Sequence, residues 1–273
     1  MRSEFLLDRD SPIPARQNLD STFVFGGPLE LKLQKVGFGF GCEIGLMTVV
    51  AISYTWNQTW QDGECVEAHP DPAMYYLGIV KKVLRFMLKT EEYSGKRVEG
   101  QQVFLFWDWL SRFQNYTGSL IDTATIGDTL VSMVKRCMDT MDLWYGSALM
   151  MIWMLTQGPP GSRDYFSRGW CDMEFGVGSL CTPSHMALDL GLLEDMTEYN
   201  SRYWFYHGGI GTIGKSCAGK RPLPMTHSKF DEMMDEKVIK DGASIPKIEF
   251  TVEADRDLIK GLYCKTFDGV VGR

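Results

Sequence analysis

Three separate runs of apolar residues, none with regular polar alternation, constrain the fold of this chain more than any other feature. They cover residues 48–54, 103–109 and 148–155. Strands of this kind are buried on both faces, which is typical of parallel sheets. Segments with helical spacing, near 71–92 and 126–142, separate the runs, and helices that connect parallel strands form right-handed crossovers. The sequence therefore predicts an α/β fold, a three-layer sandwich with a mostly parallel central sheet.

Helix signals lie before and after the third run. Asp71-Pro72 is typical of a helix start, with proline at the first helical position, and a helix to about Glu92 follows. Beyond the third run we expect a helix that contains Trp170 and Glu174, and then a helix from Ser184 to about Thr197. The end of the chain predicts a helix, a short strand at Ile248–Val252 and a helix at Ala254–Phe267.

Two segments flank the expected sheet. Residues 1–45 contain Pro12, Pro14 and Pro28 and several glycines, so we expect an extended N-terminal arm. No linker long enough to force two independent domains follows. We therefore expect residues 46–273 to form a single domain, with a mainly helical C-terminal extension at about 225–273.

Charge and cysteine usage exclude some classes of protein. A formal net charge of −7 over 273 residues argues against a nucleic-acid-binding protein. The chain has no signal-peptide-like start and no apolar stretch of membrane-spanning length. Seven cysteines occur without a Cys-x-x-Cys pair or zinc-finger spacing. We expect a cytoplasmic protein with reduced thiols, no metal site and no membrane span.

One motif resembles a nucleotide-binding loop in its letters alone. Gly209–Ser216 matches the P-loop pattern G-x-x-x-x-G-K-S. A P-loop needs a helix directly after it, whose N-terminus holds the phosphates. Gly219 and Pro222 follow too closely for that helix. We interpret the segment as a glycine-rich loop.

Polar and aromatic side chains follow the predicted strands at the end where open α/β sheets bind ligands. They are Ser53, Tyr54 and Trp56 after the first run, and Asp108, Trp109 and Ser111 after the second. On the helix after the third run, Trp170 and Glu174 are four residues apart and therefore share a face. A carboxylate among aromatic rings can bind a ribose diol beside a stacked base or nicotinamide. The alternative is that Glu174 forms a surface ion pair with Arg168 while Trp170 packs on the core.

Three short motifs resemble landmarks of Toll/interleukin-receptor (TIR)-like domains. They are Ser-Tyr-x-Trp at 53–56, Phe-Trp-Asp-Trp-Leu-Ser-x-x-Gln at 106–114, and Tyr-Phe-Ser-Arg-Gly-Trp-Cys-x-x-Glu at 165–174. The likeness spans about 50–267 and is nearest to TIR-like proteins of unicellular algae and other protists. It implies a TIR-like or flavodoxin-like sandwich. In TIR domains that degrade NAD, the glutamate after Trp-Cys is catalytic, so the resemblance implies that role for Glu174.

The leading hypothesis is therefore a TIR-like hydrolase that cleaves the nicotinamide–ribose bond of NAD. NAD or a related nucleotide would be the substrate, with no cofactor. Ser53, Tyr54, Trp56, Asp108, Trp109, Ser111 and Trp170 would line its site. One alternative is a non-catalytic signalling or scaffold domain that works by self-association, through apolar residues of the helix at 79–89 and the C-terminal segment. Another is an enzyme that processes a different nucleoside or nucleotide on the same fold.

Overall fold

The protein is described here from a computed structural model of the whole chain. The residues that the structure describes are 4–7, 10–12, 47–56, 59–61, 64–67, 70–71, 73–93, 102–108, 132, 135–183, 186–193, 224–240, 243–250 and 253–271.

A four-stranded sheet forms the centre of the fold. Its strands are β1 (Met47–Tyr54), β4 (Gln102–Trp107), β5 (Met151–Leu155) and β6 (Ala187–Asp189), in the spatial order β4-β1-β5-β6. Every neighbouring pair is parallel. The prediction of an α/β fold with a parallel sheet is confirmed, and all three apolar runs supply a strand. All five residues of β5 are buried, as expected for a strand covered on both faces.

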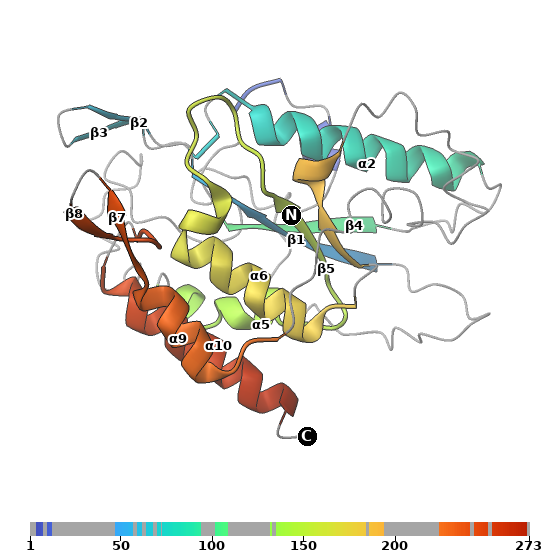
Figure 1. Ribbon diagram of the computed structural model, residues 1–273. Helices are drawn as coiled ribbons and strands as arrows, with labels where there is room; N and C mark the ends of the chain where they lie inside the picture. The colour runs from blue at the N-terminus through green and yellow to red at the C-terminus, as the bar shows by residue number, and fades with distance from the viewer. Residues whose placement is uncertain are drawn as a thin grey trace.

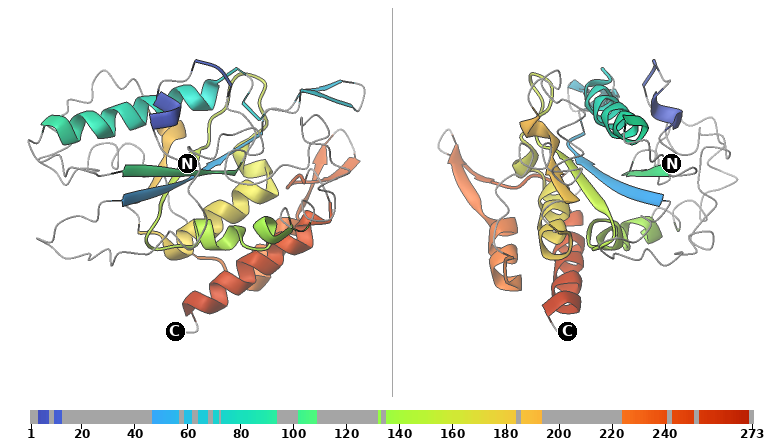
Figure 2. Two further views of the ribbon diagram at one scale, coloured as in Figure 1. Left: turned by 180° about the vertical axis from the view of Figure 1, so that it is seen from behind. Right: turned by 90° about the vertical axis from the view of Figure 1, so that its right-hand side faces the viewer.

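Helices cover the two faces of this sheet (Figures 1 and 2). Helix α2 (Tyr75–Tyr93) packs on one face, through a core that includes Val80, Val83 and Leu84. Helices α5 (Met141–Tyr145) and α6 (Gly169–Cys181) pack on the other. The chain moves from β1 to β4 in one direction across the sheet and from β4 through β5 to β6 in the opposite direction. Right-handed crossovers then require helices on opposite faces, as observed.

The segment after α6 differs from the sequence prediction. We expected a helix from Ser184 to about Thr197, but Ala187–Asp189 form strand β6 and Leu190–Leu192 form the short 3₁₀ helix η5. That prediction is wrong. Met186 and Leu190, at helical spacing, are both buried, and they pack with β5 and α2 in one core. A strand and the turn after it can bury two side chains that are four residues apart. Apolar residues on one face of a helix have the same spacing, which explains the wrong prediction.

The start of the chain reaches the core as well. Helix α1 (Glu4–Leu7) lies beside α2, and Leu6 is fully buried with the side chains under α2. Arg85 of α2 donates a hydrogen bond to the carbonyl oxygen of Leu7. The remaining residues of the expected arm, apart from 10–12, lie outside the described part of the chain. The arm therefore contributes at least one side chain to the main fold.

Helix α2 begins later than the sequence indicated. The expected start was Asp71-Pro72, whereas the first helical residue is Tyr75. The Asp71 carboxylate still acts at this end, since its Oδ2 atom accepts a hydrogen bond from the backbone N–H of Leu77 at 2.9 Å. The aspartate thus satisfies a first-turn donor from outside the helix. The expected helix at 126–142 is found in part. Residues 135–138 are helical, a turn at 139–140 separates them from α5, which ends at Tyr145, and residues 126–131 and 133–134 lie outside the described part of the chain.

The C-terminal part of the chain packs against α6. It comprises α9 (His227–Asp235), β7 (Lys237–Lys240), β8 (Ala243–Pro246) and α10 (Asp255–Val271). Strands β7 and β8 form an antiparallel hairpin that was not predicted from the sequence. The strand expected at Ile248–Val252 is wrong for its described residues, because Glu249 makes only an isolated bridge, with Arg168. A second small hairpin, β2 (Thr59–Gln61) with β3 (Glu64–Glu67), is also separate from the main sheet.

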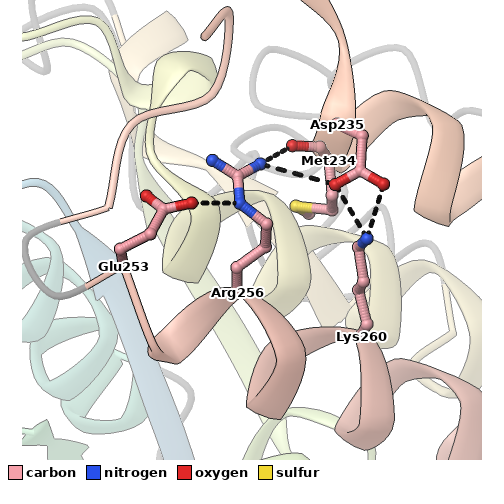
Figure 3. Close-up of polar contacts among 5 residues, drawn as sticks. All are labelled: Met234, Asp235, Glu253, Arg256 and Lys260. Carbon is pink, nitrogen blue, oxygen red and sulfur yellow. Dashed lines mark hydrogen bonds and ion pairs between the residues drawn. The ribbon is translucent and has the colours of Figure 1, made fainter.

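A group of charged side chains ties α9 to α10 (Figure 3). Arg256 donates hydrogen bonds to the carbonyl oxygen of Met234 and to the Glu253 carboxylate. Lys260 contacts both carboxylate oxygens of Asp235, at 2.8 and 2.7 Å. Because Met234 and Asp235 are the last residues of α9, these cations satisfy its C-terminal end. The two helices are therefore joined by polar contacts as well as by apolar packing.

Among the described residues, no helix has the length and apolar character needed to cross a membrane.

Candidate functional site

Buried polar side chains collect where the strands of the main sheet end. Ser53 and Tyr54 close β1, Asp108 directly follows β4, Thr156 follows β5, and Asp189 closes β6. All except the half-buried Thr156 are less than a tenth exposed. Because the strands are parallel, these ends lie at one edge of the sheet. This is the edge where open α/β sheets bind ligands, at the point where the strand order reverses, here between β1 and β5.

Glu174 lies at that point, on the face covered by α6. Its Oε2 atom accepts a hydrogen bond from the hydroxyl of Ser53 at 2.5 Å. The Ser53 hydroxyl is also hydrogen bonded to the hydroxyl of Tyr165, which belongs to the 3₁₀ helix η3 (Tyr165–Ser167) just before α6. Glu174 is 6% exposed and Ser53 0%. A surface ion pair between Glu174 and Arg168, as the alternative expected, is therefore wrong, and Arg168 lies within 3.8 Å of the Glu249 carboxylate instead. The other half of that alternative is confirmed, since Trp170 packs against the core.

Two further buried groups lie around this carboxylate. The Tyr145 hydroxyl donates to the carbonyl oxygen of Ile52, and the Cys171 thiol lies 3.5 Å from the carbonyl oxygen of Tyr54. Burial raises the pKa of both Tyr145 and Cys171 well above the ordinary values, and the negative charges of Glu174 and Asp108 raise each pKa further. Cys171 therefore stays a neutral thiol and is no candidate nucleophile.

Asp108 is the centre of a second polar group, on the other side of β1. Its two carboxylate oxygens accept hydrogen bonds from the Tyr54 hydroxyl at 2.9 Å and from the indole N–H of Trp56 at 3.1 Å. Burial, followed by the charge of Asp108, raises the pKa of Tyr54 well above its ordinary value, so the tyrosine keeps its proton and donates. Ser53 and Tyr54 are adjacent on β1 and point to opposite faces. The strand thus carries one residue of each polar group.

The other expected site residues do not all join these groups. Trp170 is half-buried, and its indole N–H donates to the Asp255 carboxylate of α10 at 2.9 Å. It therefore contacts the C-terminal extension, although it lies one turn from Glu174 on α6. Trp109 and Ser111 lie outside the described residues. The structure brings together five of the eight predicted residues, in two groups: Ser53 and Glu174, and Tyr54, Trp56 and Asp108.

Three residues at this edge were not predicted from the sequence as site residues. Tyr165 contacts Ser53, and the hydroxyl of Thr156 lies 2.5 Å from Oδ1 of Asp189, which also accepts from the backbone N–H of Gly191. Burial raises the pKa of Asp189. Thr156 follows the third apolar run, so, like Ser53, it could have been selected as a polar residue at the end of a predicted strand. Asp189 could not be selected in this way, because its strand was expected to be a helix.

Comparisons of this chain with protein-family models, with curated proteins and with solved structures find no match. The likeness to TIR-like domains therefore stays a prediction that depends on its sequence motifs. Within the ranges that the structure describes, no three His, Cys, Asp or Glu side chains lie close enough to hold a metal ion.

Proposed function

We propose that this protein is a TIR-like hydrolase that cleaves the nicotinamide–ribose bond of NAD, with Glu174 as its catalytic carboxylate. The observation that carries the proposal is the position of Glu174, a buried carboxylate held by Ser53 where the strand order of a parallel sheet reverses. Ligands of such sheets bind at this place. The carboxylate has the position and chemistry to meet a ribose.

The strand order supports a flavodoxin-like sandwich, the class to which the TIR resemblance points. Counted along the chain, the strands of the main sheet lie in the order second, first, third, fourth. This is the beginning of the flavodoxin-like order. Helices on the two faces would then make the outer layers of a three-layer sandwich.

The reaction follows from the charges involved. As the bond from C1′ of the ribose to the nicotinamide nitrogen breaks, its electron pair leaves with nicotinamide, which becomes neutral. Positive charge then develops on the ribose ring, in an oxocarbenium-like state. A carboxylate beside the ribose stabilises this charge and accepts hydrogen bonds from the ring hydroxyls. Water adds to C1′ and loses a proton, which gives ADP-ribose.

The second polar group would hold the ring of the substrate. Asp108 fixes both Tyr54 and Trp56 through its two carboxylate oxygens. Indole rings stack on bases and on nicotinamide, and this hydrogen bond fixes the edge of the Trp56 indole, which is partly buried against the core. Trp56 is the more exposed of the two aromatic residues, since Tyr54 is 5% exposed. We assign stacking to Trp56 and its orientation to Asp108.

The test is nicotinamide release from NAD by the purified protein at high concentration, beside Glu174→Gln. We expect release by the wild type and a loss of at least about a hundredfold in the variant, which keeps the shape but not the charge. Circular dichroism checks that the variant is folded. Unchanged cleavage in Glu174→Gln would remove Glu174 from the mechanism. If wild-type protein converts another nucleotide but leaves NAD intact, the alternative of a different nucleotide substrate replaces this one.

The self-association alternative relied on apolar residues of the helix at 79–89 and of the C-terminal segment. In the helix, Val80, Val83 and Leu84 are fully buried. In the C-terminal segment, Ile239 of the β7–β8 hairpin is 75% exposed and Val271 of α10 is 62% exposed, so this part of the alternative keeps its support. Sedimentation across a range of protein concentrations, without NAD cleavage, would favour this alternative.

A further inference from the structure

A chain of three buried polar side chains crosses from the sheet to α6. Ser53 lies in β1, Tyr165 in η3 and Glu174 in the second turn of α6. Ser53 and Tyr165 are 0% and 1% exposed. Strand β1 lies between β4 and β5, and Ser53 pairs with Met154 of β5. An internal strand of the sheet therefore carries the Ser53 hydroxyl.

The direction of the hydrogen bonds follows from a count of protons. Ser53 has a single hydroxyl proton and donates it to Oε2 of Glu174. The bond between Ser53 and Tyr165 then needs its proton from the tyrosine. Burial raises the pKa of Tyr165 well above its ordinary value, and the charge of Glu174 raises it further, so the tyrosine carries that proton. The chain runs from Tyr165 through Ser53 to Glu174.

Such a chain has two consequences for Glu174. A hydrogen bond to the charged form of a carboxylate favours that form over the protonated one. A fixed Oε2 atom also fixes the plane of the carboxylate, which would otherwise rotate about its last torsion angles. Without a second hydrogen bond, the Ser53 hydroxyl could rotate away from Glu174. The hydrogen bond from Tyr165 holds it in place. Each of the two hydrogen bonds adds to the preorganisation of the Glu174 carboxylate.

We infer that Ser53 and Tyr165 are positioning residues that hold Glu174 ionised and fixed in orientation. The inference rests on the proposed function for its catalytic meaning. It also gives Ser53 a different role from the substrate contact expected from the sequence, since the serine acts through Glu174. Tyr165 acts one step further away, through Ser53.

The experiment compares Ser53→Ala and Tyr165→Phe with wild type in nicotinamide release across pH. We expect kcat to fall about tenfold or more in Ser53→Ala and less in Tyr165→Phe, with KM little changed, because a hydrogen bond to a charged group is lost. The acid limb of the kcat profile should move to higher pH in both variants. A purely structural role would leave that limb in place.

Two matched variants control for the loss of a buried hydroxyl. Tyr263→Phe removes a tyrosine hydroxyl that donates to the carbonyl oxygen of Met225. Ser179→Ala removes a buried serine hydroxyl near the other end of α6. Both should lose some stability and keep the wild-type pH profile. If Ser53→Ala does not fold, Tyr165→Phe, which loses one oxygen atom only, decides the question.

A second readout does not depend on turnover. The hydroxyl protons of Ser53 and Tyr165 are buried and hydrogen bonded, so proton NMR should show two slowly exchanging signals. Tyr165→Phe should remove one of them, and Glu174→Gln should shift the Ser53 signal. If wild type releases no nicotinamide, the proposed function fails, and these signals still decide whether the chain of hydroxyls holds Glu174. An unchanged kcat profile in Tyr165→Phe, or a Ser53 signal that ignores Glu174→Gln, would overturn the inference.

Discussion

Asp172 and Glu174 are buried carboxylates two residues apart on α6, and their surroundings differ. Glu174 accepts a hydrogen bond from Ser53, whereas Oδ2 of Asp172 is buried without a hydrogen bond to any described residue. Burial, followed by the charge of Asp164, raises the pKa of Asp172 from 3.8 to about 8, and Lys247 opposes this shift. At neutral pH, Asp172 is therefore mainly a neutral acid. Local surroundings, more than residue type, decide which carboxylate of the helix can act on a cation.

This difference predicts a dependence of stability on pH. The folded protein holds a proton on Asp172 that the unfolded chain releases above pH 3.8. Asp172 therefore lowers the free energy of unfolding as pH rises from about 4 to about 8, by up to about 1.4 kcal/mol per pH unit. Asp172→Asn does not titrate. We expect its stability relative to wild type to increase steadily between about pH 5 and about pH 7.5 in urea unfolding. Parallel curves for the two proteins would mean that Asp172 is ionised in the fold.

Helices α6 and α10 both contain glycines at interior positions, but the space around these glycines differs. A Cβ atom on Gly178 of α6 would lie 2.6 Å from Cδ1 of Ile152, which is 1% exposed in β5. A Cβ atom on Gly261 of α10 would meet nothing within 4 Å. The first glycine allows α6, and with it Glu174, to approach the sheet closely. The second makes no packing contact that requires it.

Alanine at these two positions should change stability in opposite directions. Gly178→Ala places a methyl group against a buried side chain, so we expect a loss of about 1–3 kcal/mol. Gly261→Ala gains helix propensity without a clash, and we expect a gain of about 0.5–1 kcal/mol. Urea unfolding of both variants measures the free energies. A stabilising Gly178→Ala would show that α6 has room to move away from β5.

How far the sequence predicted these elements depended on burial. Strands β1, β4 and β5 were found because both of their faces are covered, which leaves an uninterrupted apolar run. The β7–β8 hairpin was missed because its side chains are mostly exposed, although the sequence Asp-Gly at 241–242 is a typical hairpin signal. The contacts of Ser53 with Tyr165 and Glu174 join residues 112 and 121 positions apart. No local spacing encodes such contacts. The end of a predicted strand pointed to Ser53, the helix spacing and the TIR-like motif pointed to Glu174, and no signal joined the two or added Tyr165.

At the scale of the whole molecule, the C-terminal extension belongs to the main core. Phe230 of α9 stacks on Tyr263 of α10, with ring centroids 3.8 Å apart. Both lie in the same apolar cluster as Met173 and Val177 of α6 and Ile152 of β5. The extension, which the sequence presented as an addition to a TIR-like domain, covers the outer side of the helix that carries Glu174. Its packing supports the position of that helix.

Removal of the extension tests this view. A chain that ends at residue 224 would expose the apolar side of α6, and we expect it to lose its cooperative unfolding transition. A chain that ends at residue 267 loses only the last turn of α10, where Val270 and Val271 are 41% and 62% exposed, and should keep the transition. Calorimetry of both chains provides the measurement. A cooperative transition in the shorter chain would show that the rest of the chain folds without the extension.

The most direct measurement compares nicotinamide release from NAD by wild type, Glu174→Gln and Asp172→Asn under the same conditions. Both variants replace a buried carboxyl group of α6 by an amide, two residues apart. We expect release by wild type and by Asp172→Asn at similar rates, and a loss of at least about a hundredfold in Glu174→Gln alone. Equal rates in all three proteins, or no release by folded wild type, would contradict the assignment of Glu174 as the catalytic carboxylate.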